Sequence, residues 1–228
     1  MRQSDVMVYL MTGFLDSGKT QFLTFTLEQD YFQIQGKTLL ILCEEGEEEY
    51  DPKEMLKYGV VIEKVEDKED LTEAWLEEMN RKHKPERVVV EYNGMWPVSD
   101  FEKLALPAGW KIEQKIATVD ASTFQMYLTN LKPLFVEMVK GAELVLFNRC
   151  EDKKPLAGYR RSVKVVSPQA EVIFEDENGE VDNIFEDEVP YDLKAPVIEI
   201  PREDYGIWYI DMQEHPERYK GKVVEFVA

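Results

Sequence analysis

The sequence predicts an α/β fold in which a mostly parallel sheet carries helices on both faces. Short runs rich in Val, Ile and Leu alternate with helical patterns along most of the chain. Strands that are covered on both faces have such continuous apolar runs, and alternation of strand and helix is typical of parallel sheets. A glycine-containing stretch joins the first apolar run to the first helical pattern.

The expected elements follow from this alternation. The predicted strands cover residues 6–11, 38–43, 88–92, 115–120, 143–148 and 171–174. Helical periodicity is present over residues 18–29, 68–82 and 123–140. We expect Pro133 to break or kink the last of these helices, because proline cannot continue the helical hydrogen bonding.

The chain changes character towards its C-terminal part. Residues 175–192 are acidic and contain Gly and Asn, which indicates a surface hairpin or a linker. A strand, a helix and a final apolar run are expected over residues 197–200, 204–219 and 222–228. Either the final run closes a sheet edge, or the chain is a fragment of a longer protein. We predict a main domain over 1–192 and a short C-terminal α/β extension over 193–228, which faintly resembles the start of a small barrel-like domain.

Composition and charge exclude several classes of function. The 228-residue chain has a net charge of −19, which repels nucleic acid and anionic membrane surfaces but suits solubility, cations or a basic partner. Cys43 and Cys150 are the only cysteines, so no disulfide framework is expected. The sequence shows neither a signal-peptide pattern nor an apolar run of about 20 residues. We therefore expect a soluble cytoplasmic protein whose partners include neither nucleic acid nor membrane.

The stretch GFLDSGKT, residues 13–20, fits the pattern G-x-x-x-x-G-K-[ST] and lies between an expected strand and an expected helix. Such a loop surrounds a polyphosphate with backbone N–H groups, and the helix N-terminus favours the anion. Lys19 would reach the β and γ phosphates, and the Thr20 hydroxyl would ligate Mg²⁺. The predicted nucleotide-binding residues of this segment are Gly13, Phe14, Leu15, Asp16, Ser17, Gly18, Lys19, Thr20 and Gln21.

Asp16 and Glu91 are acids with expected roles near the phosphates. A carboxylate at Asp16 is unusual because it faces anionic phosphate, so it points either outward or towards a catalytic water or metal. Glu91 ends an apolar run, and Gly94 follows three residues later. The Glu91 carboxylate can hold the water shell of Mg²⁺ at a strand end, while the Gly94 N–H faces the γ-phosphate.

A second group of acids follows the strand over 38–43. Glu44, Glu47 and Asp51 form either a solvated acidic loop or a loop that moves with nucleotide state and offers oxygen ligands. The predicted metal ligands are Thr20, Glu44 and Glu91. The predicted catalytic residues are Lys19, Asp16, Glu47 and Glu91.

A third motif follows the strand over 143–148. Asn148, Arg149 and Glu151 form the pattern N-[KR]-x-[DE], where GTPases carry a guanine-reading Asn-Lys-x-Asp element. The acid accepts hydrogen bonds from guanine N1–H and the 2-amino group, and Arg149 can stack on the purine. Asp152 competes with Glu151 for this role. Guanine is favoured over adenine, and an ATP-using small-molecule kinase is the alternative.

Together these motifs resemble the CobW-like branch of the P-loop GTPases, which includes UreG and HypB. The resemblance covers about residues 6–175. GFLDSGKT stands where that branch has GFLGSGKT, LCEEGEEEYD resembles NEFGEVGID, and VVVEYNGMWP resembles IETTGLADP. IATVDAS, LVLFNRCED and SPQAEVIF resemble three further motifs in the same order. The resemblance implies a P-loop NTPase fold and a Mg²⁺-dependent GTPase that handles a metal or cofactor for a client enzyme. Turnover is expected to be slow because no arginine finger is evident.

The chain departs from this family pattern in one motif. A CxCC motif is usual between the acidic segment and the ExxG strand, and the corresponding YGVVIEKVEDKED has no cysteine. The soft thiolate site is therefore missing from its usual place, which favours a nucleotide-dependent binding switch over a dedicated zinc chaperone. A second transition metal and a nucleotide-dependent dimer stay open. We expect Cys43 to be buried, and His83 and His215 to be exposed without metal-binding partners.

Overall fold

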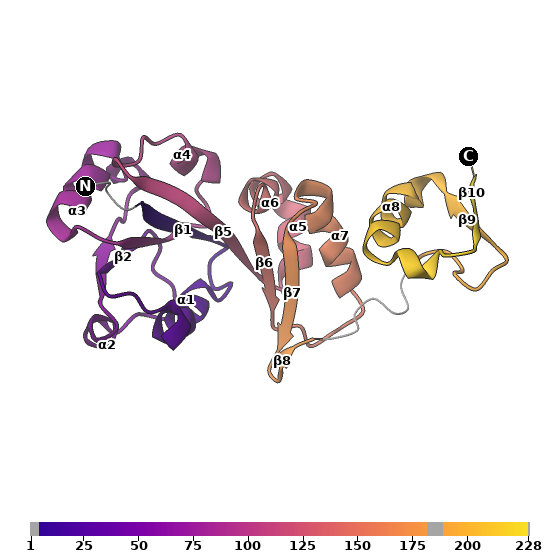
Figure 1. Ribbon diagram of the computed structural model, residues 1–228, viewed down its shortest axis with the longest axis horizontal. Helices are drawn as coiled ribbons and strands as arrows, with labels where there is room; N and C mark the ends of the chain where they lie inside the picture. Colours follow the sequence, from indigo (N-terminus) through magenta and orange to yellow (C-terminus); the bar gives the residue numbers. More distant parts are fainter. Residues whose placement is uncertain (1–4, 182–188, 228) are drawn as a thin grey trace.

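The computed structural model describes residues 5–181 and 189–227 (Figure 1). Its main sheet has eight strands in the order β3-β2-β4-β1-β5-β6-β7-β8. Every neighbouring pair is parallel except β7 and β8. The prediction of an α/β fold with a mostly parallel sheet is therefore confirmed.

The elements have the following bounds. The strands are β1 Val6–Thr12, β2 Thr38–Leu42, β3 Val60–Lys64, β4 Arg87–Glu91, β5 Trp110–Asp120, β6 Leu144–Asn148, β7 Glu171–Asp176, β8 Gly179–Glu180, β9 Val197–Pro201 and β10 Val223–Val227. The helices are α1 Lys19–Glu28, α2 Pro52–Lys57, α3 Glu73–His83, α4 Val98–Glu102, α5 Phe124–Asn130, α6 Lys132–Val139, α7 Leu156–Val166 and α8 Tyr205–Glu214. Short 3-10 helices cover Asp30–Phe32, Lys68–Asp70, Arg202–Asp204 and Pro216–Arg218.

Helices cover both faces of the sheet. On one face, Leu10 of β1 belongs to the same buried cluster as Leu76 of α3 and Phe101 of α4. On the other face, the next residue, Met11, shares a cluster with Leu27 of α1. Successive side chains of a strand point to opposite faces, so β1 is covered from both sides, as its continuous apolar run predicts.

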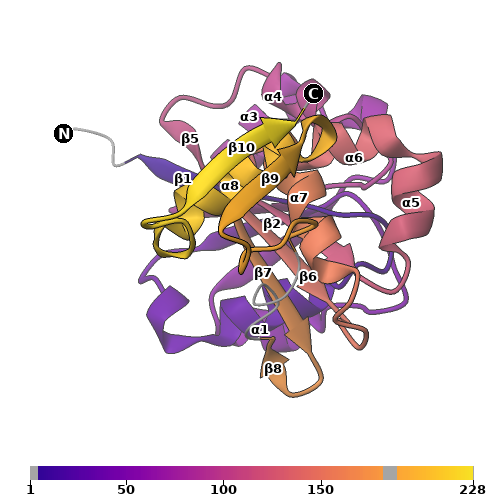
Figure 2. The same cartoon turned by 90° about the vertical axis from the view of Figure 1, so that its right-hand side faces the viewer.

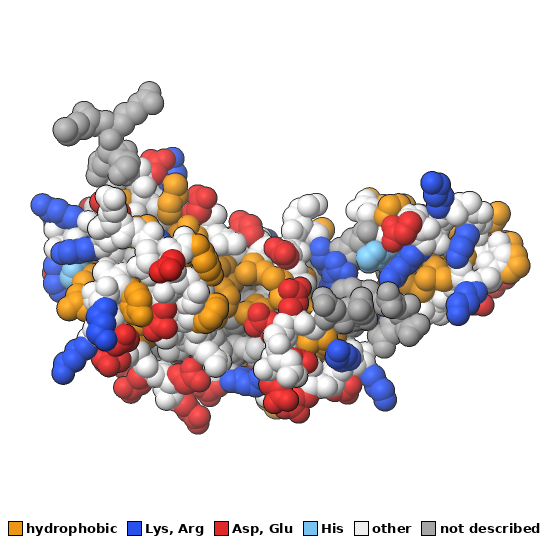
Figure 3. All heavy atoms as spheres, turned by 60° about the horizontal axis from the view of Figure 1, so that its bottom comes forward, with side chains coloured by type: hydrophobic (Ala, Val, Ile, Leu, Met, Phe, Trp, Pro, Cys, Tyr) orange, Lys and Arg blue, Asp and Glu red, His pale blue; other side chains and the backbone are white. Residues whose placement is uncertain are grey.

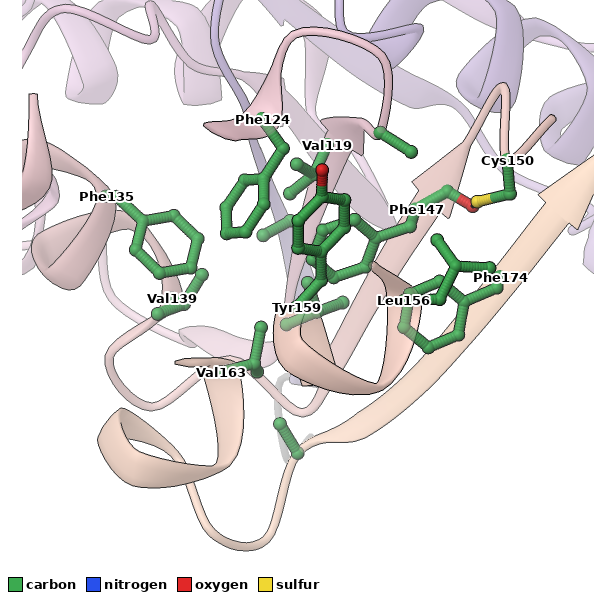
Figure 4. Packing of buried hydrophobic residues seen from close by; sticks show 14 of the residues in the cluster. Val119, Phe124, Phe135, Val139, Phe147, Cys150, Leu156, Tyr159, Val163 and Phe174 are labelled. Carbon is green, nitrogen blue, oxygen red and sulfur yellow. The ribbon is translucent and has the colours of Figure 1, made fainter. Parts of the chain in front are cut away.

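An aromatic cluster fixes α5, α6 and α7 on the half of the sheet that contains β6 and β7 (Figure 4). Phe124 lies 5.0 Å from Phe135 and 5.1 Å from Phe147, between ring centroids, and Phe147 lies 4.9 Å from Phe174. Aromatic pairs at such distances add to the free energy gained by burial. The cluster therefore sets the end of β6, where Asn148 follows Phe147.

Several helix predictions need correction or refinement. The helix predicted over 123–140 divides at Leu131, and Pro133 lies in the first turn of α6, so the predicted break is confirmed. The helix predicted over 68–82 begins as a 3-10 turn, and α3 starts only at Glu73, after its N-cap Thr72 accepts a hydrogen bond from Trp75 N. The strand β3 and the helices α2, α4 and α7 were not among the predicted elements.

The segment predicted as a hairpin or linker is a hairpin in its first part. Asp176 of β7 pairs with Gly179 of β8 in an antiparallel ladder. Residues 182–188 lie outside the described residues. Beyond them, β9 and β10 form a separate parallel pair with α8 beside it (Figure 2). The final apolar run therefore pairs with β9 and closes no edge of the main sheet. The boundary at residue 192 stays a prediction.

The lengths of the helices bear on whether the chain can cross a membrane. Within the described ranges, every helix is too short or too polar to traverse a bilayer. The longest ones, α3 and α7, have 11 residues each.

Candidate nucleotide site

The loop between β1 and α1 is curled. Asp16 and Gly18 have φ values of 58° and 84°, in the left-handed region that favours glycine. The Ser17 N–H donates to the Phe14 carbonyl at 3.1 Å, which closes a turn within the loop. A Cβ at Gly13 would lie 2.4 Å from Ser17 Oγ, so only glycine fits there without displacement. The sequence pattern predicts this compact course.

The curled loop leaves backbone donors available. Within the described residues, the N–H groups of Leu15, Asp16, Gly18, Lys19 and Thr20 donate no backbone hydrogen bond. Gly18 precedes α1 without a side-chain cap. Adjacent unpaired N–H groups in a turn and at a helix N-terminus form a binding site for an anion, because their dipoles point positive charge towards it.

The side chain of Lys19, the first residue of α1, folds back into this loop. The residue is 4% exposed, and its Nζ donates to the carbonyl oxygens of Gly13 and Phe14 at 2.9 Å each. Its counter-ion is Glu44, whose Oε2 lies 2.5 Å from the same Nζ. The ammonium group is therefore held inside the loop, and the acidic segment after β2 supplies its negative partner.

Glu91, at the end of β4, is 3% exposed. Its Oε1 accepts a hydrogen bond from Thr20 Oγ1 at 2.9 Å, and its Oε2 accepts one from the Tyr50 hydroxyl. Burial raises the pKa of the Glu91 carboxyl, although the hydrogen bond from Tyr50 and the charge of Lys19 act in the opposite direction. Two hydroxyl donors thus fix this carboxylate beside the loop.

Tyr50 is a functional candidate that sequence reasoning missed. Burial raises the pKa of its phenol, so the group stays protonated and acts as a donor to Glu91. A signal was present in the sequence, because Tyr50 is the only aromatic residue within the acidic stretch EEGEEEYD. Its partner could not be found from the sequence, since the two residues are far apart along the chain.

The predicted catalytic and metal-binding residues surround one small cavity of about 80 Å³. Asp16, Lys19, Thr20, Glu44, Glu47 and Glu91 all line this cavity. Asp51 does not belong to the cavity, because its carboxylate accepts from Lys53 N at 2.9 Å and caps α2. The structure therefore joins the phosphate loop, the ExxG strand and the acidic loop, and it gives Asp51 a structural contact.

The Asp16 carboxylate faces the acidic loop. A Cβ at Gly46 would lie 3.3 Å from Asp16 Oδ1. Asp16 is exposed and also lines the small cavity, so both orientations that the sequence left open for it stay predictions.

The third motif is tied directly to the phosphate loop. Asn148 Nδ2 donates to the Ser17 carbonyl at 2.8 Å, and Arg149 Nη1 donates to the Asp16 carbonyl at 2.9 Å. Arg149 also forms an ion pair with Asp120 at the end of β5, with a distance of 2.6 Å. Asn148 Oδ1 is buried and has no partner among the described residues. These contacts fix the motif next to the phosphate loop.

A larger hollow of about 670 Å³ lies beside this motif. Gln21, Asn148, Arg149 and Glu151 line it together with residues 175–178 of the β7–β8 hairpin. Asp152 does not line the hollow, because its Oδ1 accepts from Lys154 N at 3.0 Å. Glu151 therefore borders the hollow and Asp152 does not, and base recognition by either acid stays a prediction.

Gly94 lies against the phosphate loop. A Cβ at this position would be 2.2 Å from the Gly13 carbonyl oxygen and 2.8 Å from Phe14 Cα. The segment after β4 can therefore approach the loop so closely only with glycine at this position. The expected contact between the Gly94 N–H and a γ-phosphate stays a prediction.

Across residues 5–181 and 189–227, no three His, Cys, Asp or Glu residues are arranged to hold a metal ion. Cys43 is buried, as predicted, and burial raises the pKa of its thiol. The expectation of an exposed His83 was wrong, because the last turn of α3 places its Nε2 2.7 Å from Glu63 Oε1 and leaves the side chain 14% exposed. His215 is half-buried, 3.5 Å from Glu217.

Fold and loop together define an α/β protein of the P-loop class. The sequence profile of the family "CobW/HypB/UreG, nucleotide-binding domain" matches residues 7–174. The chain belongs to this family, and the resemblance seen in the sequence motifs is confirmed.

Solved structures show the same fold. The hydrogenase maturation factor HypB from Archaeoglobus fulgidus is 19% identical, with a TM-score of 0.50 over 76% of this chain and 82% of that one. The Zn(II)-bound YjiA GTPase from E. coli is 22% identical, with a TM-score of 0.55. That match covers 79% of this chain and 60% of the YjiA chain. No curated protein sequence matches the chain.

Proposed function

We propose that the chain is a Mg²⁺-dependent GTP-binding protein that hydrolyses GTP slowly and couples its nucleotide state to the handling of a metal or cofactor for a client protein. The observation that carries this proposal is the position of Lys19, buried in a curled loop with unpaired backbone N–H groups around it. A charged donor and several amide donors around one centre are the chemistry that a triphosphate requires.

The phosphates and Glu44 are competitors for Lys19. Both are anions, and Glu44 already pairs with the buried ammonium at 2.5 Å. In this proposal phosphate displaces the Glu44 carboxylate, because the three ammonium hydrogens of Lys19 already bond to Gly13, Phe14 and Glu44. In this proposal the acidic segment after β2 changes its contacts with nucleotide state.

Thr20 and Glu91 fit a magnesium ion. They provide a hydroxyl and a carboxylate, which are hard oxygen donors, 2.9 Å apart. The buried Glu91 carboxylate accepts hydrogen bonds from the hydroxyls of Tyr50 and Thr20. A divalent cation beside it would offset the free-energy cost of burying its negative charge. Bound there, the cation would neutralise phosphate charge. Glu44, the third predicted ligand, is held by Lys19, and this pair of oxygen donors does not need it to hold the ion.

The remaining residues of the small cavity are candidates for hydrolysis. Asp16 and Glu47 line it and carry carboxylates that can orient an attacking water. We expect slow turnover because Arg149, the arginine that lines this cavity, is already paired with Asp120. An arginine that stabilises the transition state must be able to reach the transferring phosphoryl group.

Calorimetric titration with GTP and ATP, with and without Mg²⁺, tests the nucleotide assignment. We expect micromolar or tighter GTP binding, and a loss of about 100-fold in Lys19→Ala, because charge-assisted hydrogen bonds to phosphate are lost. Lys57→Ala is the matched control, since Lys57 is an exposed lysine of α2 paired only with its neighbour Glu54. Equal GTP affinity in wild type and Lys19→Ala would refute the loop assignment.

The base preference needs its own variants. Glu151→Ala is expected to reduce the preference for GTP over ATP, whereas Asp152→Ala is expected to preserve it, because Asp152 bonds to Lys154 N. A clear ATP preference in the wild type would contradict guanine recognition and favour the small-molecule kinase.

The metal-handling part of the proposal is supported by the printed descriptions of two neighbours, a maturation factor and a Zn(II)-bound GTPase. The test is to add Zn²⁺, Co²⁺ or Ni²⁺ to the protein loaded with GTP and Mg²⁺ and to measure stoichiometry. Tight stoichiometric binding supports metal transfer. Absence of binding favours a nucleotide-dependent binding switch, which light scattering with GTP and with GDP would examine for dimerisation.

A further inference from the structure

A second cavity, of about 540 Å³, lies between α2 and the edge strand β3. Its apolar lining includes Leu42, Tyr50, Leu56, Val60 and Ile62. Leu56 is 63% exposed, although it belongs to this apolar surface. An exposed leucine at the mouth of an apolar cavity is a contact that a partner side chain can bury.

The mouth of this cavity is acidic. Four glutamates line it: Glu44, Glu45, Glu48 and Glu49. Two of them have cationic partners, because Glu44 pairs with Lys19 and Glu45 pairs with Lys64. Glu48 and Glu49 form no ion pair with any described residue. Asp and Glu side chains, with some Lys and Arg among them, line the lower edge of the main part of the molecule in Figure 3.

The strand beside the cavity has an open edge. Within the described residues β3 pairs with β2 alone, so its other edge presents unpaired backbone groups. An extended peptide can add to such an edge, with main-chain hydrogen bonds for affinity and a side-chain pocket for specificity. The apolar cavity, the acidic mouth and the open edge lie together.

The cavity also shares walls with the nucleotide site. Glu44 and Glu48 line both the 540 Å³ cavity and the small cavity at Lys19. Tyr50 lines the 540 Å³ cavity, and its hydroxyl donates a hydrogen bond to Glu91 in the nucleotide site. A change at either cavity therefore acts on residues of the other.

We propose that this groove binds an extended basic segment of a partner protein, which places an apolar side chain against Tyr50 and Leu56 and Lys or Arg side chains against the glutamates, and that GTP strengthens this binding. Charge complementarity selects the occupant, since the chain carries −19 overall and the mouth of the groove is acidic. The GTP-dependent part rests on the proposed function.

The direction of the coupling follows from Glu44. While Glu44 neutralises Lys19, its charge is unavailable to a basic partner. Phosphate binding to Lys19 releases the carboxylate to the mouth of the groove, which gains one uncompensated negative charge. By linkage, the partner segment must then strengthen GTP binding by the same factor.

The first experiment measures fluorescence anisotropy of the labelled peptide Lys-Val-Lys-Leu-Lys-Val-Lys with nucleotide-free protein. We expect binding that falls about tenfold in Leu56→Gln, because one buried leucine contact is lost. Val165→Gln on α7 is the matched control, since Val165 is also exposed, at 76%, and lies outside the groove. The same peptide with Glu in place of Lys should not bind.

Three results would overturn the groove assignment. Equal binding of the acidic peptide would remove the charge argument, and equal effects of Leu56→Gln and Val165→Gln would place the peptide elsewhere. A dimer detected by light scattering and abolished by Leu56→Gln would assign the groove to a second copy of the chain.

The second experiment repeats the titration with GTP and Mg²⁺. We expect the peptide to bind several-fold more tightly, and we expect Glu44→Gln to lose this increase. If GTP binds but peptide affinity is unchanged, the coupling is refuted. If GTP does not bind at all, the proposed function fails, whereas the nucleotide-free titration still decides whether the groove binds the basic peptide.

Discussion

At the residue scale, the buried charge of Glu91 has two opposite effects. It lowers the free energy of unfolding, and it supplies the negative charge that a bound cation would need. Its carboxylate is 3% exposed, and burial raises its pKa above the ordinary value of 4.5. A raised pKa means that the folded protein binds the proton more tightly than the unfolded chain does. Keeping this group ionised at neutral pH therefore costs folding free energy, although the charge is what a cation at Thr20 and Glu91 requires.

We predict that Glu91→Gln stabilises the nucleotide-free protein at pH 7 and weakens Mg²⁺-dependent GTP binding. The amide keeps an oxygen that accepts from Thr20 or Tyr50 but removes the buried charge. Urea unfolding measures the stability, and calorimetry with and without Mg²⁺ measures the binding. The control is Glu78→Gln on α3, an exposed glutamate for which no change is expected.

The raised pKa of Glu91 also predicts how the stability difference between Glu91→Gln and wild type changes with pH. For a carboxyl with a raised folded pKa, the stabilising contribution is present below the unfolded pKa and is lost as pH rises through the folded pKa. The advantage of Glu91→Gln over wild type should therefore be larger at pH 7 than at pH 5. If Glu91→Gln is less stable than wild type at both pH 5 and pH 7, the buried charge of Glu91 does not destabilise the fold.

At the scale of elements, the segment that joins β4 to α4 is fitted to the phosphate loop through Gly94. We predict that Gly94→Ala destabilises the protein by about 1–3 kcal/mol and weakens GTP binding. The added Cβ would lie 2.2 Å from the Gly13 carbonyl oxygen, and backbone atoms cannot move aside as a flexible side chain can. Thermal unfolding and nucleotide titration measure the two effects.

Gly206 of α8 provides the comparison for this substitution. A Cβ there meets no atom within 4 Å, so Gly206→Ala should raise stability by about 0.5 kcal/mol through the unfolded chain. If both alanine variants behave alike, the close approach at Gly94 does not govern the site.

The elements that the sequence predicts well are those whose burial leaves a simple pattern. Central strands such as β2 and β4 are buried along their whole length, so their residues form continuous apolar runs. The edge strand β3 is only partly buried, and its short sequence VVIEK is too mixed in polarity to stand out as a buried strand. The helix α7 combines Gly158 with β-branched valines, which lowers its helix propensity, although Leu156, Tyr159 and Val163 share one buried face.

The same distinction holds for the candidate site. The loop over 13–20 and Glu91 were predicted because local sequence determines a strand, a turn and a helix start. The contacts Lys19–Glu44 and Tyr50–Glu91 join residues that are 25 and 41 positions apart, and the pairing of β4 with both β1 and β2 brings them together. Sequence patterns within one segment carry no information on such partners.

At the scale of the whole molecule, the buried clusters separate the main sheet from the C-terminal extension. Ile198, Ile200, Tyr191 and Tyr219 form a cluster whose further members all lie between residues 189 and 224. Every residue of the nucleotide site lies before them in the chain and belongs to the main sheet and its loops. Stability of the extension and affinity for nucleotide should therefore vary independently.

We predict that Ile198→Ala destabilises the extension by about 2–5 kcal/mol, because Ile198 is fully buried and its loss leaves a cavity. GTP affinity should stay at the wild-type value. Hydrogen exchange followed by mass spectrometry should show faster exchange in β9 and α8 and unchanged exchange in β1 and β4. Leu27→Ala, in the cluster under α1, should give the reverse pattern, with faster exchange in β1 and weaker GTP binding. If Ile198→Ala speeds exchange in β1 and β4 as much as in β9, the two parts unfold as one cooperative unit, and the separation of their clusters has no energetic meaning.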